Sequence, residues 1–187
     1  MQTACASAFT PPVAGAPEAA RVAMSYSSSL RVALKSPSLR ARTRALVAFH
    51  RPDALRVEIP GPLGPRLVAV ARLGQLTAVF PGDRCVFTGE ASADAFASLL
   101  GIALDPSEIM DLLVGVSSRK LRAYRAGWGP ELPNAIEATL PDGGRLKVQV
   151  LDADLGPNLG SRAFEAPLSE GYRAVTADEA RALWSAR

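Results

Sequence analysis

Residues 22–35 alternate between apolar and polar or small side chains, and this period of two constrains the fold more than any other feature of the chain. Successive residues of a β-strand point to opposite faces of a sheet. The segment therefore predicts a long strand with one buried face. The buried set is Val22, Met24, Tyr26, Leu30, Val32 and Leu34, and the other set is Ala23, Ser25, Ser27, Ser29, Arg31 and Lys35.

Short turns connect this segment to further extended segments. Ser36-Pro37-Ser38 leads into a predicted strand over about 39–50, and Arg51-Pro52-Asp53 leads into one over 55–59. Because successive strands joined by tight turns run in opposite directions, we expect an antiparallel meander. Three shorter strands continue it, near 66–72, 75–80 and 84–88, with turns at Gly74 and Pro81-Gly82-Asp83.

The period changes at Ser92, which is a suitable cap for a helix ending near Gly101. Asp105-Pro106-Ser107-Glu108 contains a cap, a first-turn proline and a capping-box glutamate, so it predicts a second helix ending at Gly115. Strands are then expected near 119–125, 134–140 and 145–152, shorter extended pieces near 162–166 and 171–175, and a final helix from Thr176.

The order of many strands, two helices and more strands predicts a mainly β fold with some helix. A long antiparallel sheet has to bury one face, and the two inserted helices are the natural cover. We therefore expect a strongly curved antiparallel sheet, an open half-barrel, covered by these helices. Aromatic residues make up only 6% of the chain and alanine is abundant, which favours an unfilled space inside the curve.

Residues for catalysis are scarce. His50 is the sole histidine, so any Ser-His-Asp or Cys-His arrangement depends on it. Asp152 and Asp154 have no further carboxylate or histidine at metal-ligand spacing, and Cys85 is interpreted as a core residue. No glycine-rich phosphate loop is present. We therefore expect a protein that is not an enzyme and uses no cofactor or metal.

Charge gives no support to nucleic-acid binding. The formal net charge is only +3. Arg40, Arg42 and Arg44 share one face of a predicted strand and are interpreted as its solvated side. Exposed aromatic residues between basic ones, which single-stranded nucleic acids require, are missing.

The first residues resemble the end of a bacterial lipoprotein signal. Small residues precede Cys5, the candidate site of lipid attachment, and the segment after it is small and proline-rich. The interpretation is a tether over residues 1–21 and a single domain over 22–187. No apolar run reaches the roughly 20 residues that span a bilayer.

The loop Pro60-Gly61-Pro62-Leu63-Gly64-Pro65 joins two predicted strands. Prolines stiffen it, and Leu63 at its centre has few neighbours. One interpretation is an ordinary turn whose leucine folds back onto the sheet. The other is an apolar tip, formed by Pro62, Leu63 and Gly64, that dips into a membrane, where immersing one leucine contributes about 1.5–3 kcal/mol.

Several short segments resemble the LolB family of outer-membrane lipoprotein receptors, within the LolA/LolB carrier superfamily. The first runs from Asp53 through Ile59 into Gly61-Pro62-Leu63-Gly64. The others are Phe87-Thr88-Gly89-Glu90, Leu99-Leu100-Gly101 and Leu112-Leu113-Val114-Gly115. The resemblance covers about residues 22–175. It implies a half-barrel that accepts lipoprotein acyl chains from a soluble periplasmic carrier, a membrane-inserting Leu63, and anchoring at Cys5 in the outer membrane.

Such a function has a simple physical basis, because an exposed acyl chain costs about 0.8 kcal/mol per methylene in water. Two alternatives remain: an envelope lipoprotein of the same fold that binds another amphiphile or a partner protein, and a purely structural envelope lipoprotein. The candidate cavity lining is Val57, Ile59, Leu76, Phe80, Phe87, Phe96, Leu100, Ile109, Leu112, Leu113, Ile136, Val148 and Val150.

Overall fold

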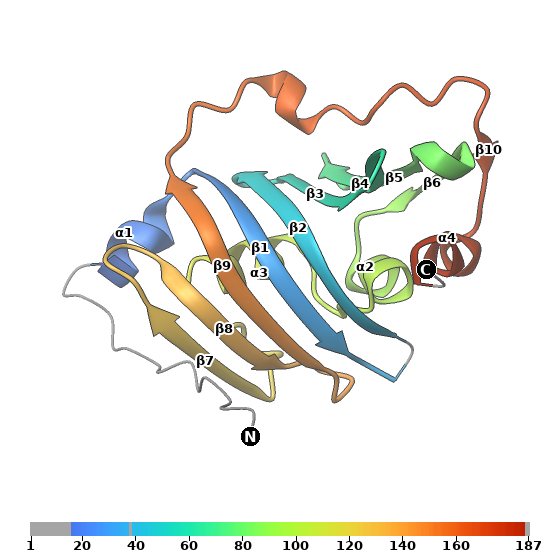
Figure 1. The fold of residues 1–187 in the computed structure, drawn as a ribbon. Coiled ribbons are helices and arrows are strands. Elements are labelled where there is room, and N and C mark those ends of the chain that lie inside the picture. The colour runs from blue at the N-terminus through green and yellow to red at the C-terminus, as the bar shows by residue number, and fades with distance from the viewer. Residues whose placement is uncertain (1–15, 38, 186–187) are drawn as a thin grey trace.

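The computed structural model describes residues 16–37 and 39–185, and in this part of the chain a single sheet of ten strands dominates (Figure 1). Four α-helices and two short 3₁₀ helices accompany it. The elements are α1 Ala16–Val22, β1 Ser25–Lys35, β2 Arg40–His50, β3 Ala54–Gly61, β4 Gly64–Arg72, β5 Gln75–Phe80, η1 Pro81–Asp83, β6 Cys85–Glu90, α2 Ala93–Leu100, α3 Pro106–Leu113, β7 Ala123–Trp128, β8 Pro133–Thr139, β9 Arg145–Leu155, η2 Ser161–Phe164, β10 Arg173–Ala174 and α4 Ala177–Ser185.

The strands lie in the order β10-β6-β5-β4-β3-β2-β1-β9-β8-β7. Strands β1 to β6 form the predicted antiparallel meander, and β9 returns to pair with the free edge of β1. The sheet is open, because β7 and the two-residue strand β10 are its edges. Strand β10 pairs with β6 in parallel, which is the one departure from the antiparallel prediction in the described chain.

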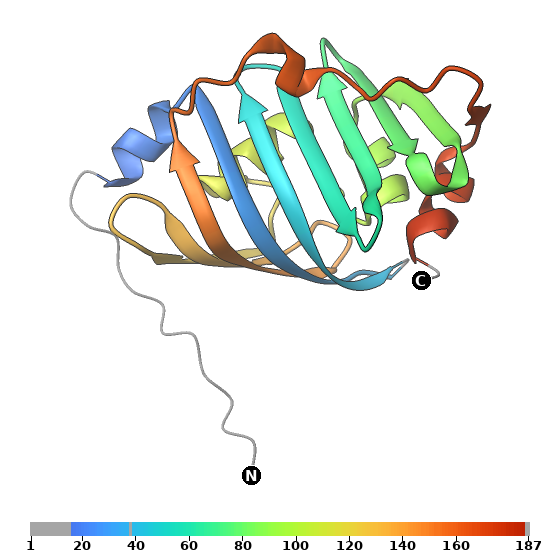
Figure 2. The ribbon, with the colours of Figure 1, turned by 45° about the horizontal axis from the view of Figure 1, so that its top comes forward.

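The sheet curves strongly around α2 and α3, which lie on its concave side (Figure 2). The predicted open half-barrel with two covering helices is thereby confirmed. Helix α4 packs on α2 and on β5 and β6, so it closes one end of the concave side. The main hydrophobic core lies between the sheet and these helices.

The lid is defined here as α2, α3 and the connecting residues 101–105, and local sequence determines where its helices begin. The Ser92 hydroxyl accepts a hydrogen bond from the Ala95 N–H at 3.3 Å. At α3 the Glu108 carboxylate accepts one from the Asp105 N–H at 3.0 Å, which completes a capping box. Both predicted helix starts are confirmed.

A second, smaller hydrophobic cluster lies on the convex side of the sheet. The strap, defined as residues 156–172, leaves the end of β9 and crosses toward β10 at the far edge (Figure 1). Phe164 in η2 packs beneath the strap against Ala54, Val68 and Val70 of β3 and β4. The cluster anchors the strap to the sheet.

Three local predictions are wrong. Residues 16–22 form α1, with Ala20 in the core, so the predicted tether over residues 1–21 extends too far. The first strand was predicted to begin at Val22, but Val22 and Met24 are exposed and precede it. Residues 161–164 form a 3₁₀ helix where an extended piece was expected. Strand β7 begins at Ala123, four residues later than predicted.

Candidate functional site

The concave face of the sheet is apolar because four neighbouring strands point their apolar residues to the same side. In β1 these are Leu30, Val32 and Leu34. Val32 lies between Thr43 of β2 and Val148 of β9 in the strand register. The rows of inward side chains therefore continue across β9, β1, β2 and β3.

Small side chains on β2 leave part of the concave face unfilled. Ala41, Thr43 and Ala45 point inward, where the neighbouring strands carry leucine, valine and isoleucine. Because α2 and α3 rest on the larger neighbours, space remains above the short ones.

The lid covers this space from the opposite side. It contributes Leu100 and Ile102 near the end of α2, and Ile109, Leu112 and Leu113 from α3. Gly101 ends α2 at φ +72°, and a Cβ there would lie 2.9 Å from Leu34 Cδ2. The close approach of the helix end to the sheet therefore requires glycine at this position.

Between lid and sheet lies a cavity of about 90 Å³. Thr43 contributes the one hydroxyl of its lining; every other lining side chain is aliphatic. A space with so few polar partners does not hold ordered water well and suits hydrocarbon. Its lining is Leu30, Val32, Leu34, Ala41, Thr43, Ala45, Val47, Val57, Ile59, Leu100, Ile102, Leu104, Ile109, Leu112, Leu113, Leu146 and Val148.

The structure brings seven of the predicted lining residues together at this cavity: Val57, Ile59, Leu100, Ile109, Leu112, Leu113 and Val148. The other six do not border it. Leu76, Phe80, Phe96 and Ile136 are fully buried in the packed core, and Phe87 and Val150 pack against that core. Four of the six lie on β5, β6 and α2, at the end of the concave side that α4 closes.

Sequence reasoning missed the contribution of β2. Ala41, Thr43 and Ala45 alternate with the exposed Arg40, Arg42 and Arg44, so the arginines already identified the inward face. The small size of Ala41, Thr43 and Ala45 then indicated that the cavity lies over β2.

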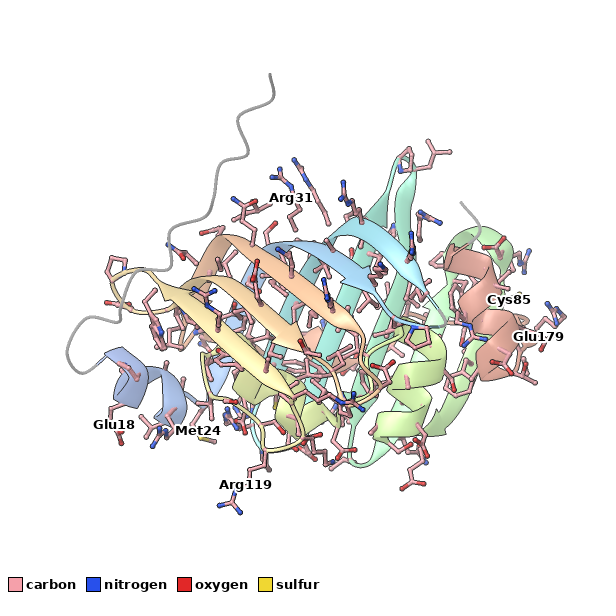
Figure 3. All side chains as sticks on the ribbon, turned by 90° about the horizontal axis from the view of Figure 1, so that it is seen from below. Glu18, Met24, Arg31, Cys85, Arg119 and Glu179 are labelled. Atoms are coloured by element: carbon pink, nitrogen blue, oxygen red, sulfur yellow. The ribbon has the colours of Figure 1, made fainter. Side chains whose placement is uncertain are left out.

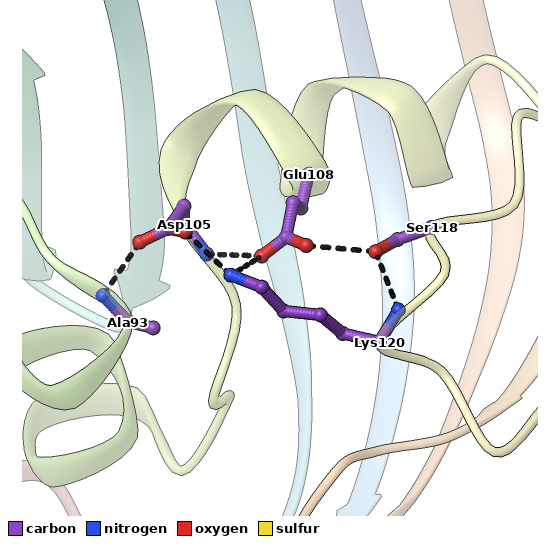
Figure 4. A network of polar contacts seen from close by, with 5 residues as sticks. All are labelled: Ala93, Asp105, Glu108, Ser118 and Lys120. Atoms are coloured by element: carbon purple, nitrogen blue, oxygen red, sulfur yellow. Dashed lines mark hydrogen bonds and ion pairs between the residues drawn. The ribbon is translucent and has the colours of Figure 1, made fainter.

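A polar network holds the start of α3 at the rim of the lid (Figure 4). The Lys120 ammonium donates to Asp105 at 2.8 Å and to Glu108 at 3.2 Å. Asp105 also accepts from the Ala93 N–H at 2.9 Å, and Glu108 accepts from the Ser118 hydroxyl at 2.7 Å. The hydrogen bond from Lys120 is the largest contribution that lowers the pKa of Asp105, and the same contact raises the pKa of Lys120.

A second polar contact ties α3 to the turn between β2 and β3. Arg51 Nη2 lies 2.7 Å from Asp111 Oδ1, and both side chains are partly exposed. The Arg51 guanidinium also lies 5.4 Å from the centre of the Phe49 ring. Both polar contacts lie at the rim of the lid, and none of the residues that line the cavity is charged.

Leu63 stands apart from the cavity, at the tip of the β3–β4 hairpin. Pro62 and Leu63 form the turn, and Gly64 has φ +118°, a conformation that side chains rarely adopt. Leu63 is fully exposed. Of the two interpretations of this loop, the structure has the protruding leucine rather than one folded onto the sheet.

The remaining sequence candidates do not join a site. Cys5 lies outside the described residues. His50 is exposed at the end of β2, and Cys85 is buried at the start of β6. Within residues 16–37 and 39–185, no three His, Cys, Asp or Glu side chains group as metal ligands would. None of the helices in that same part is long and apolar enough to cross a bilayer.

No protein-family model matches the sequence, and no curated protein matches it significantly. Solved structures do match. A domain named for outer membrane lipoprotein sorting, from Vibrio parahaemolyticus, has 8% identity and a TM-score of 0.48, over 75% of this chain and 89% of that one. A LolA superfamily protein from Nitrosomonas europaea has 10% identity and a TM-score of 0.49, over 84% and 99%. A DUF1329 family protein from Desulfovibrio piger has 10% identity and a TM-score of 0.45, over 83% and 98%.

Proposed function

We propose that this protein is a non-enzymatic lipid carrier of the bacterial envelope, which binds lipoprotein acyl chains between its sheet and lid and delivers them to the outer membrane. The observation that carries the proposal is the cavity, whose lining is aliphatic apart from Thr43. Such a lining offers hydrocarbon a dry environment and offers a polar ligand almost no hydrogen bonds.

The size of the cavity defines what the lid has to do. An engineered cavity of about 150 Å³ takes up one benzene molecule, so the present 90 Å³ holds only a short piece of hydrocarbon. A full acyl chain requires α3 to move away from the sheet. In this proposal, entry of a chain is therefore coupled to movement of the lid away from the position it has in this structure.

The free energy gained by binding a chain is of the same order as the cost of this movement. Each methylene transferred from water into an apolar site contributes about 0.8 kcal/mol, so a chain of a dozen carbons gains on the order of 10 kcal/mol. Against this stand the contacts of α3 with the sheet and the partly exposed Arg51–Asp111 ion pair. Partly exposed ion pairs contribute about 1 kcal/mol or less. Movement of α3 also exposes Ile109, Met110, Leu112 and Leu113, which are buried in the structure. At about 1.5–3 kcal/mol per side chain this cost is of the same order as the gain from the bound chain, which takes the place of the lost contacts.

Delivery uses two features outside the cavity. Leu63, which is fully exposed at the hairpin tip, is the residue that we propose enters the bilayer, and acylated Cys5 is proposed to confine the protein to the membrane surface. In this proposal a soluble periplasmic carrier brings the lipoprotein, and no nucleotide, metal or covalent intermediate takes part.

The test is uptake of a fluorescent fatty acid by the protein and two matched variants. Ala45→Leu adds three carbons inside the cavity, and Ala33→Leu adds the same three carbons on the opposite face of the neighbouring strand. We expect wild type and Ala33→Leu to bind the probe with similar affinity. Ala45→Leu should bind at least about tenfold more weakly, since the space for roughly two methylenes is occupied.

The melting temperature of Ala45→Leu serves as the control for folding, because filling a cavity leaves stability equal or higher. Equal probe binding by all three proteins, or no uptake by wild type, would remove the carrier function. Mass spectrometry of lipid bound to protein purified from its own host would then distinguish lipoprotein acyl chains from another amphiphile.

A further inference from the structure

The convex side of the sheet carries a concentration of positive charge that the cavity does not use. Seven cations from three adjacent strands point outward at one end of the sheet, and all are exposed. We call this set the basic face. It consists of Arg31 and Lys35 on β1, Arg40, Arg42 and Arg44 on β2, and Arg145 and Lys147 on β9.

The strand register places like charges directly opposite each other. Arg31 pairs with Arg44, and Lys35 pairs with both Arg40 and Arg145. Like charges at directly opposed positions destabilise a sheet. The fold therefore accepts a cost here that a bound anionic surface would relieve.

Little in the described part of the chain neutralises the basic face. Lys147 lies 2.6 Å from Glu137 on β8, and Arg31 donates a hydrogen bond to the neutral Gln149 at 3.0 Å. Among the described residues, no ion pair joins the other five cations to a carboxylate. The whole chain has a net charge of only +3, so the seven cations of the basic face are a strong local concentration of positive charge.

The apolar hairpin tip lies on the same side as the basic face. Leu46 of β2 pairs with Glu58, so β3 runs from there toward the Arg40 end of the sheet before it turns at Pro62 and Leu63. Figure 3 shows the β3–β4 hairpin extending in the direction in which Arg31 points, whereas Arg119 points the opposite way. A bilayer that receives Leu63 is therefore also within reach of these cations.

We infer that the basic face docks the protein on an anionic phospholipid surface and orients it so that the β3–β4 hairpin enters the bilayer. This inference deepens the proposed function by giving the chemistry of the membrane partner, and it rests on that function only for the role of Leu63. The outward residues of this region include no aromatic side chain on which a nucleic-acid base would stack. Several interchangeable cations beside one apolar tip match a charged lipid surface, since each cation adds a similar increment.

The experiment measures sedimentation with vesicles of phosphatidylcholine alone and of phosphatidylcholine with phosphatidylglycerol. We expect wild type to prefer the anionic vesicles. Each Lys or Arg at such a surface contributes about fivefold in affinity, so the double reversal R42E/R44E should bind these vesicles at least about 25-fold more weakly. Added salt should weaken wild-type binding, because the screening length falls from about 30 Å at 0.01 M to about 8 Å at 0.15 M.

A matched control separates the basic face from net charge. R21E/R119E removes the same charge from exposed positions on α1 and on the side opposite Arg31 (Figure 3). It should retain nearly all binding to anionic vesicles. Equal losses in both double variants, no preference of wild type for anionic vesicles, or full binding by R42E/R44E would each overturn the inference. An acidic protein that binds wild type and not R42E/R44E, while vesicles show no preference, would point to a protein partner instead.

Failure of this inference is distinguishable from failure of the carrier function. The fluorescent fatty acid assay contains no vesicles and reports on the cavity alone, so R42E/R44E should take up the probe as wild type does. Its melting temperature should be equal or higher, because R44E places an opposite charge across from Arg31. Anionic vesicle binding without probe uptake would leave the docking face standing and remove the carrier function. Probe uptake without a preference for anionic vesicles would support the carrier function and remove the docking face.

Discussion

At the scale of single residues, β2 shows how neighbouring positions serve different purposes. Ala41, Thr43 and Ala45 open the cavity, while the arginines between them point outward. The separation depends on the two-residue period of a strand alone. A shift of one residue in the register would exchange the two faces, and would place arginine in the hydrocarbon space.

Leu63 permits the sharpest test at this scale, because it makes few contacts in the folded protein. Leu63→Glu should leave the unfolding free energy within about 0.5 kcal/mol of wild type, as expected for an exposed site. Its binding to vesicles should weaken by about 10- to 100-fold, because one immersed leucine contributes about 1.5–3 kcal/mol. Vesicle sedimentation and chemical unfolding measure the two quantities.

Leu168→Glu is the matched control, since Leu168 is also almost fully exposed but lies in the strap. It should bind vesicles nearly as wild type does. If both leucine variants lost the same affinity, the added negative charge would be responsible and the hairpin would have no special role.

Residue roles were predictable from the sequence where burial alone decides them. Alternation identifies an inward face, and it does so correctly for Val57, Ile59 and Val148. It does not separate a cavity wall from a packed core, because both are buried. Phe80 and Phe96 lie in packed core, in the region where α4 covers β5 and α2, and this contact between distant segments has no signature in the local pattern.

At the scale of elements, caps and turns made the helices of the lid predictable. Ser92 and the Asp105–Glu108 capping box are local signals, and the structure uses both. Predictions failed where tertiary contacts decide. Residues 16–22 are helical with Ala20 in the core, and residues 161–164 coil so that Phe164 reaches β3 and β4.

The ion pair at the start of α3 predicts a dependence of stability on pH. The pKa of Asp105 is lowered below its ordinary value of 3.8 in the folded protein, mainly by the hydrogen bond from Lys120. Its contribution is therefore present above about pH 3.8 and is lost as the pH falls through the lower, folded pKa. Asp105→Asn keeps a good capping residue and removes the charge, so the variant should be slightly less stable than wild type at neutral pH and equally stable in acid.

Urea unfolding at a series of pH values measures this difference. Asp94→Asn, in the first turn of α2, is a control that removes a carboxylate without a described ion pair. A gap between wild type and Asp105→Asn that stayed constant down to the lowest pH would show that the charge of Asp105 plays no part.

At the scale of the whole molecule, the small volume of the cavity predicts a lid that opens without unfolding the sheet. Helix α3 is held by apolar side chains and a few exposed polar contacts, whereas β1 and β2 are hydrogen-bonded on both sides. Amide protons of α3 should therefore exchange through a local opening that depends weakly on denaturant, and those of β1 and β2 only through global unfolding. Native-state hydrogen exchange distinguishes the two, and equal protection of α3 and β1 would contradict a mobile lid.

The strap has a mechanical consequence for this molecule. It leaves the sheet at β9, packs on β3 and β4 through Phe164, and rejoins the sheet where β10 pairs with β6. A segment of fixed length therefore crosses the convex surface. A change in the curvature of the sheet would change the distance that the strap has to cross. We therefore expect the strap to hold the curvature of the sheet, so that a change in cavity volume would come from movement of the helices.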